Sequence, residues 1–262
     1  KATTAKATTA ATTKATTAAT TAATTAATTA ATTAAPSAPS VYSGTPDTSW
    51  FDKDNPKAEY TLTTADQFAG MAKLRQDSKG AITFEGITIK LGKDMIINAG
   101  TAEQYLASGT IREITGIGSS YKFKGTFDGQ NHTVNGVYIN ATSSCVRGLF
   151  GGLGDNAVIK NLKLTNAYFD GPEASKHTAG ILAARANGTN ILISNVIVEN
   201  VLMEESANEN TFYGVGILVG KVDENMSLTI ENCSTSGTVD FTNKGTKAIA
   251  GMVGFTSKGS TL

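Results

Sequence analysis

Apolar residues recur along the chain in a six-residue pattern: apolar, any residue, Gly or Asn, apolar, any residue, small or apolar. Five segments match it: 84–89, 134–139, 159–164, 193–198 and 230–235. The third position is held only by Gly86, Gly136, Asn161, Asn195 and Asn232. Glycine and asparagine are the residues that best tolerate the left-handed backbone region. The pattern therefore predicts a tight bend between two short strands.

A second pattern, a glycine followed by apolar and small residues, precedes the later bends. It starts at Gly148, Gly180, Gly216 and Gly251, which are 32, 36 and 35 residues apart. The bends advance over the same region by 25, 34 and 37 residues. Two markers that advance together indicate one structural unit that is repeated.

Each unit holds about three short strands, and such units bury a continuous apolar column only when they stack. We therefore predict an all-β fold, a parallel β-helix solenoid, right-handed by the usual chirality of parallel crossovers. Two inward ladders are expected: Leu162, Val196 and Cys233 in one, and Asn161, Asn195 and Asn232 in the other. An antiparallel sandwich would also explain the glycine-rich turns, but not the synchronous markers.

Two segments carry helix start signals. Thr64 and Gln67 form a capping box, and Phe68, Met71 and Leu74 follow on one face. This predicts a capping helix at 65–78, ended near Gly80, that covers the first coil and hides its strand edges. A second capping box, formed by Thr101 and Gln104, predicts a short helix at 101–107 in an excursion between the first two coils.

The two chain ends carry further expectations. Earlier units start a strand 11 to 14 residues after the glycine of the second pattern, and 11 residues after Gly251 is Leu262. We therefore expect an uncapped C-terminal end and further coils beyond it. The chain begins at Lys1 without a signal peptide, so we expect a processed or excised piece.

Residues 1–35 contain 16 Thr, 16 Ala and 3 Lys and nothing else. Without large side chains they cannot bury enough apolar area to offset their backbone entropy. The tail is a flexible spacer, a stalk with O-linked sugars, or a segment packed between copies of the chain; an isolated helix is disfavoured by its β-branched threonines. The candidate O-glycosylation sites are Thr3, Thr4, Thr8, Thr9, Thr12, Thr13, Thr16, Thr17, Thr20, Thr21, Thr24, Thr25, Thr28, Thr29, Thr32 and Thr33. Residues 36–49 are predicted to be a Pro/Ser linker, and residues 50–262 the β-helix domain, starting near Trp50.

Overall charge, hydropathy and cysteine content exclude several classes of protein. Lys and Arg total 22, as do Asp and Glu, and no basic patch is present, so we expect no nucleic-acid partner. The sequence contains no run of about 18 apolar residues, so we expect no membrane-spanning helix. Cys145 and Cys233 are too few for a disulfide scaffold and lack zinc-ligand spacing. We expect no bond between them, and we expect Cys233 to behave as a small buried apolar residue.

Three segments resemble bacterial surface proteins that carry GLUG-type repeats: 64–74, 84–91 and 123–134. The Gly-Leu-Phe-Gly motif at Gly148 and the Ile-x-Asn motifs are similar to the repeats themselves. The resemblance spans roughly residues 48–262 and implies a parallel β-helix, secretion or wall attachment, and an adhesive or structural role. Region 92–118 departs from it, because Ile114-Thr-Gly-Ile-Gly118 stands where the family has a Trp-Pro-Ile-Gly-like strand.

Candidate chemistry is sparse. Glycoside cleavage needs two carboxylates about 5–10 Å apart, and the acids show no such stacking at equivalent repeat positions, so we predict no catalytic residues. Asp128, Asp155 and Asp170 are expected in turns, held by local backbone hydrogen bonds. The acids of the loop around Glu204, Glu205 and Glu209 are expected to be solvated.

The histidines, the remaining acids and the asparagines suggest no catalytic role. His132 and His177 are expected at surface or turn positions. No cofactor is predicted, although Asp223, Glu224 and Asn225, or the Glu204 loop, would suit a structural Ca²⁺ ion. Five residues match the Asn-x-Ser/Thr pattern, several of them expected by chance in a chain this rich in Ser and Thr: Asn131, Asn140, Asn187, Asn225 and Asn232. Of these, Asn232 is expected to point into the core.

We expect the chain to be a structural or adhesive module of an extracellular cell-surface protein or fibre, with the tail as an O-glycosylated or assembly-packed shaft. Its expected partners are other copies of itself or surface polysaccharide. The alternative is a polysaccharide-binding or polysaccharide-cleaving β-helix. An ice- or mineral-binding face would need flat Thr-x-Thr ladders, and none recurs at equivalent positions.

Overall fold

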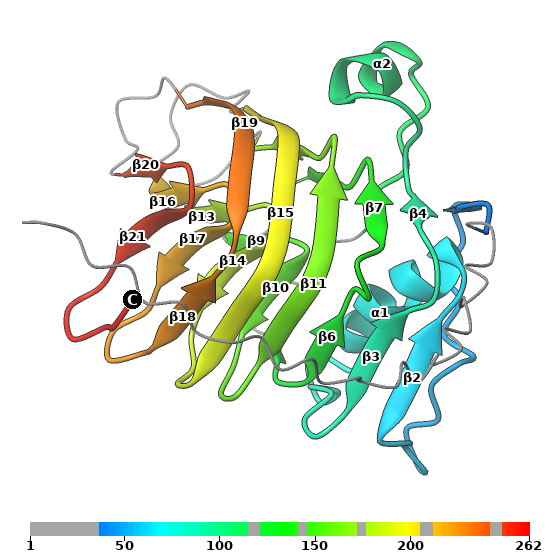
Figure 1. Cartoon of the computed structure of the whole chain (residues 1–262), viewed down its shortest axis with the longest axis horizontal. Coiled ribbons are helices and arrows are strands. Elements are labelled where there is room, and N and C mark those ends of the chain that lie inside the picture. Colours follow the sequence, from blue (N-terminus) through cyan, green and yellow to red (C-terminus); the bar gives the residue numbers. More distant parts are fainter. Residues whose placement is uncertain (1–36, 115–120, 141–145, 172–176, 205–211, 242–247) are drawn as a thin grey trace, which may run out of the picture. The chain divides into compact units, whose positions relative to one another are not determined.

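Short strands stack into three parallel sheets that wind around one apolar interior (Figure 1). The computed structural model describes residues 37–114, 121–140, 146–171, 177–204, 212–241 and 248–262. Within these residues the chain forms a β-solenoid of about four turns. Every strand pairing between them is parallel. The predicted all-β parallel solenoid is therefore confirmed, and the antiparallel sandwich is excluded.

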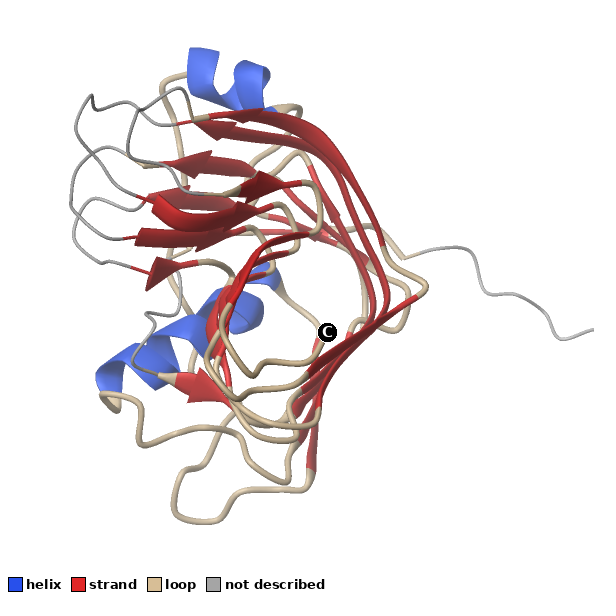
Figure 2. Cartoon of the chain, turned by 90° about the vertical axis from the view of Figure 1, so that its left-hand side faces the viewer, coloured by secondary structure: helices blue, strands red, loops and turns tan. Residues whose placement is uncertain are grey.

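The view along the solenoid shows the three sheets around the interior (Figure 2). The largest sheet, here the long sheet, comprises β1 (Ser40–Val41), β2 (Glu59–Leu62), β3 (Thr88–Leu91), β4 (Met95–Ile96), β6 (Thr126–Asp128), β7 (Thr133–Asn135), β8 (Tyr138–Asn140), β11 (Val158–Thr165), β12 (Tyr168–Asp170), β15 (Ile191–Glu204), β18 (Leu228–Glu231) and β19 (Ser234–Asp240). The second comprises β5 (Lys122–Phe123), β10 (Phe150–Leu153), β14 (Ala183–Ala186), β17 (Val219–Val222) and β21 (Val253–Thr256). The third comprises β9 (Val146–Arg147), β13 (His177–Gly180), β16 (Phe212–Gly216) and β20 (Ile249–Ala250).

Register along the long sheet follows the predicted repeat. Leu162 pairs with Val196, and Ile197 pairs with Ser234, which sets Cys233 over Val196. The first predicted ladder is thus confirmed. Leu162 and Val196 are buried, whereas Cys233 is only half-buried, because it belongs to the last described turn.

Asparagines mark three successive corners of the coil, each in the left-handed region. Pairs on adjacent turns are Asn156 with Asn190, Asn161 with Asn195, and Asn166 with Asn200, all with φ between 52° and 60°. In each pair the later side-chain amide donates to the earlier carbonyl, over 3.4 Å at the first corner and 3.2 Å at the second. These bonds tie the turn of β11 to the turn of β15 through side chains as well as backbone.

The predicted bends are confirmed as left-handed positions, but their equivalence is not. Gly86 lies at the first corner and Gly136 at the third, whereas Asn161, Asn195 and Asn232 share the second. Every corner needs the same left-handed residue, so the local pattern cannot distinguish corners. The second ladder also faces outward, and Asn232 is exposed, so its predicted inward orientation was wrong.

Helix α1 (Ala65–Asp77) begins with the predicted capping box and replaces the two shorter sheets in the first turn, between β2 and β3. Phe68 is fully buried, and its ring lies 6.1 Å from that of Phe127. The predicted capping helix is confirmed. Strand β2 pairs only with β3 among the described strands, so the helix covers the interior of the coil and not that strand edge.

The fold starts earlier than predicted. β1 pairs with β4, Tyr42 is buried, and the compact unit spans Ser37–Leu262. Asp47 packs so closely on Gly70 that a Cβ there would lie 1.8 Å from the Asp47 carbonyl oxygen. Most of the predicted linker 36–49 is therefore built into the first turn. The tail, residues 1–35, lies outside the described residues.

Side chains inside the last described turn are less buried than their equivalents one turn earlier. Ile230 and Val253 are partly exposed, whereas Ile193 and Val219, their register partners, are fully buried. A recess of about 380 Å³ is lined there by Ile230, Ala250, Met252, Val253 and Leu262.

Candidate functional site

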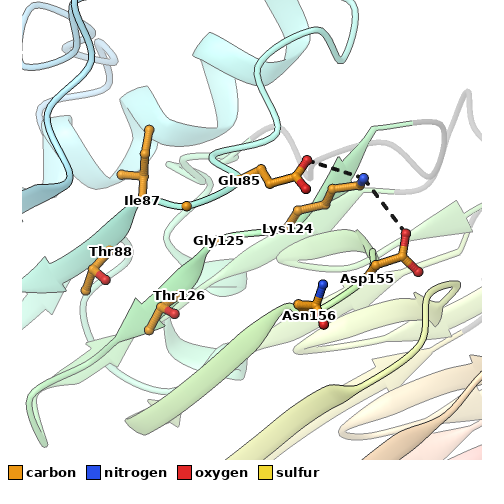
Figure 3. Close-up of a pocket in the computed structure, with 9 residues that line it drawn as sticks. Glu85, Ile87, Thr88, Lys124, Gly125, Thr126, Asp155 and Asn156 are labelled. Atoms are coloured by element: carbon orange, nitrogen blue, oxygen red, sulfur yellow. Dashed lines mark hydrogen bonds and ion pairs between the residues drawn. The ribbon is translucent and has the colours of Figure 1, made fainter.

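A polar recess of about 300 Å³ lies on the first corner, over the early turns of the solenoid (Figure 3). Thr88, Thr126 and Val158 are register partners, so the residues two before them, Gly86, Lys124 and Asn156, occupy equivalent positions. The asparagine ladder that joins Asn190 to Asn156 therefore stops at Lys124. Gly86 has no side chain, and a Cβ built on it meets nothing within 4 Å. The recess is the space that this interruption leaves.

Charged groups line the recess in alternation. The Lys124 ammonium lies 3.4 Å from the Glu85 carboxylate and 3.8 Å from that of Asp155, as the dashed lines in Figure 3 show. Asp155 also accepts hydrogen bonds from the Thr189 amide, at 3.0 Å, and from its hydroxyl. The Thr189 amide is the main cause that holds the pKa of Asp155 below its usual range, with Lys124 and Lys122 adding to it. Asp155 lies in a turn as predicted, but its partners belong to the coils on either side, Lys124 to the preceding one and Thr189 to the next.

A second polar surface runs along the outer edge of the long sheet. Register pairs Asp170 with Glu204 and Glu204 with Asp240, so these three acids stack on adjacent turns. We call them the acid ladder. Neighbouring strands lie about 4.8 Å apart, which brings stacked carboxylates into the range that glycoside cleavage uses. The prediction that no acids stack at equivalent positions was therefore wrong.

The strand register between turns explains why the sequence pattern did not predict the acid ladder. The spacings are 34 and 36 residues, and the second contains an irregularity between Val198 and Val201. Counting along the chain from the bend motif does not show where such an irregularity falls. Glu205 and Glu209 of the same predicted loop lie outside the described residues.

Tyrosines and helix α2 (Ala102–Ala107) flank the acid ladder. The Tyr138 and Tyr168 rings stack with centroids 5.6 Å apart and planes 11° apart, and Tyr105 of α2 packs against Tyr168. The Tyr168 hydroxyl lies 3.3 Å from the Glu204 carboxylate. Burial, then the charges of Asp170 and Glu204, raise the pKa of Tyr168 above its usual range. Helix α2 has the predicted capping box at Thr101, and the structure shows that it covers this outer face.

Asp128 and Asp170 end strands β6 and β12, so the predicted turn positions were wrong for both, and Asp128 is buried. Burial raises its pKa, yet the Gln130 amide at 3.0 Å, the Asn161 amide at 3.0 Å and the Lys160 ammonium at 3.4 Å outweigh this, and the net pKa lies below the usual range. His132 is in a turn, with Nδ1 3.0 Å from Asp94. His177 begins strand β13.

Among the residues suggested as calcium ligands, Asp223 is already engaged in ion pairs, and residues 205–211 of the Glu204 loop lie outside the described residues. Asp223 accepts from the Arg185 guanidinium at 2.6 Å and lies 3.3 Å from the Lys221 ammonium, so two cations already neutralise it. In the part of the chain that the structure describes, no group of three or more His, Cys, Asp and Glu residues is placed to hold a metal ion. Cys145 and the candidate glycosylated threonines lie outside that part.

Comparisons with known proteins identify no family for the chain and a relative that matches only part of it. No family model matches the chain, and no solved structure matches it. A protein of Evansella cellulosilytica named "Putative Gly-rich membrane protein" is 35% identical over 78 residues, which cover 30% of this chain and 9% of that protein. The chain thus spans about a tenth of the length of the relative it matches. Among the described helices, none has the length and apolar character needed to cross a membrane.

Proposed function

We propose that the chain is a structural or adhesive module of an extracellular cell-surface protein or fibre. The observation that supports this most is the apolar ladder that continues from turn to turn, together with the asparagine pairs that join the turns of β11 and β15 at three corners. Such stacking makes a stiff repetitive body that holds outward polar side chains at a fixed spacing. Stiffness and repeated display are what a fibre or adhesin module requires.

The extracellular location of the module belongs to the proposal. It is supported by the resemblance of segments 64–74, 84–91 and 123–134 to surface proteins with GLUG-type repeats. The name of the partial relative, which describes a Gly-rich membrane protein, agrees with a surface setting.

Surface proteolysis of intact cells tests this location. Cells that make the native protein are treated briefly with a protease, and the released peptides are identified by mass spectrometry. We expect peptides from residues 37–262 to be released before any from cytosolic marker proteins. Release that occurs only after lysis, together with the markers, would contradict the proposed location.

The Thr/Ala tail is proposed to be the shaft, either O-glycosylated or packed between copies. Its 16 threonines are acceptors, and its small side chains allow close packing. Intact-mass spectrometry of the native protein separates the versions: mass above 27.0 kDa that maps to the tail supports sugars. An unmodified tail that resists protease supports packing. An unmodified tail that is cut at once contradicts both.

A polysaccharide-binding or polysaccharide-cleaving role is the second candidate, and the acid ladder beside the stacked tyrosines favours it. Acids and aromatic rings on one face are common in sugar-binding surfaces. We propose that the module does not cleave glycans, and release of reducing ends from common polysaccharides tests this. Activity that is lost in Glu204→Gln but kept in Glu231→Gln, a matched exposed acid, would establish the cleaving role.

A further inference from the structure

The recess at the first corner offers hydrogen-bonding groups that the described part of the protein leaves without partners. Asn156 accepts from Asn190 through Oδ1, and its Nδ2 donor makes no bond among the described residues. The equivalent position on the preceding turn holds Lys124, whose ammonium has donors but no acceptor. The hydroxyls of Thr88 and Thr126, both half-buried, also have no bond within that part.

The charges of the recess select the chemistry of a ligand. A metal cation is disfavoured because the Lys124 ammonium already lies between the carboxylates of Glu85 and Asp155. A phosphate or other anion is disfavoured because it would face those two carboxylates. An apolar ligand would leave the polar lining unpaired. A neutral ligand with several hydroxyl groups satisfies the carboxylates as a donor and the ammonium and amide as an acceptor.

The side chains that line the recess lie around an open space. Figure 3 shows Glu85, Lys124 and Asp155 on one side of the recess and Thr88 and Thr126 on the other. Gly86 also lines the recess, and a Cβ built on it would meet no atom within 4 Å. The lining groups belong to corners of three successive turns, and the paired strands that adjoin these corners, β3, β6 and β11, hold the corners side by side.

We propose that this recess binds one neutral sugar unit, held by Glu85, Lys124, Asp155 and Asn156. The inference deepens the adhesive function proposed above and rests on it, because it assigns that function a surface and a ligand class. A single, half-open subsite binds weakly, and repeated copies on a cell surface would raise the effective affinity.

Two glycine substitutions give a matched test. Gly86→Asn places a side chain in the recess, and asparagine tolerates the φ of 74° found there without a clash. Gly109→Asn is the control, because Gly109 has a φ of 69° and equally open space but lies just after α2. Both variants are expected to fold, which their amide NMR spectra verify.

The ¹⁵N-labelled protein is titrated with the methyl α-pyranosides of glucose, mannose and galactose. We expect saturable amide shifts centred on Gly86, Gly125 and Asn156 for at least one of them, kept in Gly109→Asn and abolished in Gly86→Asn. Lys124→Gln is expected to weaken binding about tenfold, as loss of one charged hydrogen bond does.

No saturable shift with any of the three sugars, or equal shifts in Gly86→Asn, would overturn the proposal. These outcomes are separate from the test of the proposed function. Surface proteolysis that releases the domain while the recess binds no sugar leaves the surface module standing without this ligand. Sugar binding in a protein that is released only after lysis would remove the adhesive role instead.

Discussion

The asparagines at the corners stabilise the coil in two ways. They adopt the left-handed backbone conformation, and their side chains form hydrogen bonds to the adjacent turn. Asn195 has a φ of 53° and donates to Asn161 over 3.2 Å. Asn195→Ala forces a β-carbon without an amide into that region and removes the bond. We expect it to lower the free energy of unfolding by about 2 kcal/mol. Asn195→Gly keeps the backbone and should cost about half as much in chemical denaturation; equal losses would contradict a backbone role.

Arg75 is a residue that the fold accommodates poorly. It has 0% exposure, and none of its guanidinium nitrogens has a hydrogen-bond partner within the described residues. Burial lowers its pKa to about 9, and its guanidinium carbon lies 5.8 Å from the Phe123 ring centre. A buried, unpaired charge is costly.

Replacing Arg75 with an apolar residue of similar length is therefore expected to help. Arg75→Met should raise the free energy of unfolding by about 1 to 3 kcal/mol, measured by chemical denaturation. Arg75→Ala serves as the control for lost packing, since it removes the stem as well as the charge. If Met destabilises the protein as much as Ala, the contact with Phe123 outweighs the desolvation of the charge, and this interpretation fails.

At the scale of elements, two helices with the same capping box lie in different settings. α1 closes the first turn and buries its own Phe68 in the core. α2 packs outside the solenoid, where its Tyr105 contacts Tyr168. Thr64→Ala should lower the global free energy of unfolding by about 1 to 2 kcal/mol. Thr101→Ala should chiefly speed hydrogen exchange of the α2 amides. Equal effects of both variants on global unfolding would contradict this division.

The contact between α2 and the outer tyrosines predicts a dependence on pH. Burial raises the pKa of Tyr138 from 10.0 to about 12, and the pKa values of Tyr105 and Tyr168 are also raised, chiefly by burial. The folded state thus holds these phenol protons more tightly than the unfolded state. Stability from the neutral rings is present below pH 10 and is lost as pH rises toward 12.

Denaturation midpoints measured across that window test the dependence. The wild-type midpoint should fall steeply, and the double variant Tyr138→Phe, Tyr168→Phe, which cannot ionise at either ring, should fall less. Tyr60→Phe is a control, because Tyr60 belongs to the core cluster inside the solenoid and not to the cluster that α2 forms with the outer tyrosines. Parallel curves for the wild type and the double variant would contradict a role for the outer tyrosines.

Local signals were readable from sequence, and relations between turns were not. Both capping boxes and the left-handed bends depend on a few neighbouring residues, so they were predicted correctly. The acid ladder of Asp170, Glu204 and Asp240 depends on strand register across an irregularity, and the recess depends on Gly86 and Lys124 sharing one corner. The inclusion of Ser40–Val41 in the long sheet depends on pairing with β4, more than 50 residues later. Such contacts are set by packing of the whole coil.

At the scale of the molecule, each functional surface follows from stacking. The interior ladder of Phe127, Ile159 and Ile193 is fully buried and fixes which residues face outward. The same register aligns the carboxylates at one edge and interrupts the asparagine ladder at another. A shift of one residue would reverse every inward and outward position. The recess, the acid ladder and the proposed display of polar groups therefore share one premise, the register between turns.

Methyl and side-chain amide NMR of the labelled protein tests that premise most directly. We predict nuclear Overhauser contacts between the methyl groups of Leu162 and Val196, and between the side-chain amide of Asn195 and Asn161, pairs that are each 34 residues apart. Both contacts should be present in the same sample. Their absence, with contacts typical of antiparallel neighbours along Val158–Thr165 instead, would contradict the solenoid and every site built on it.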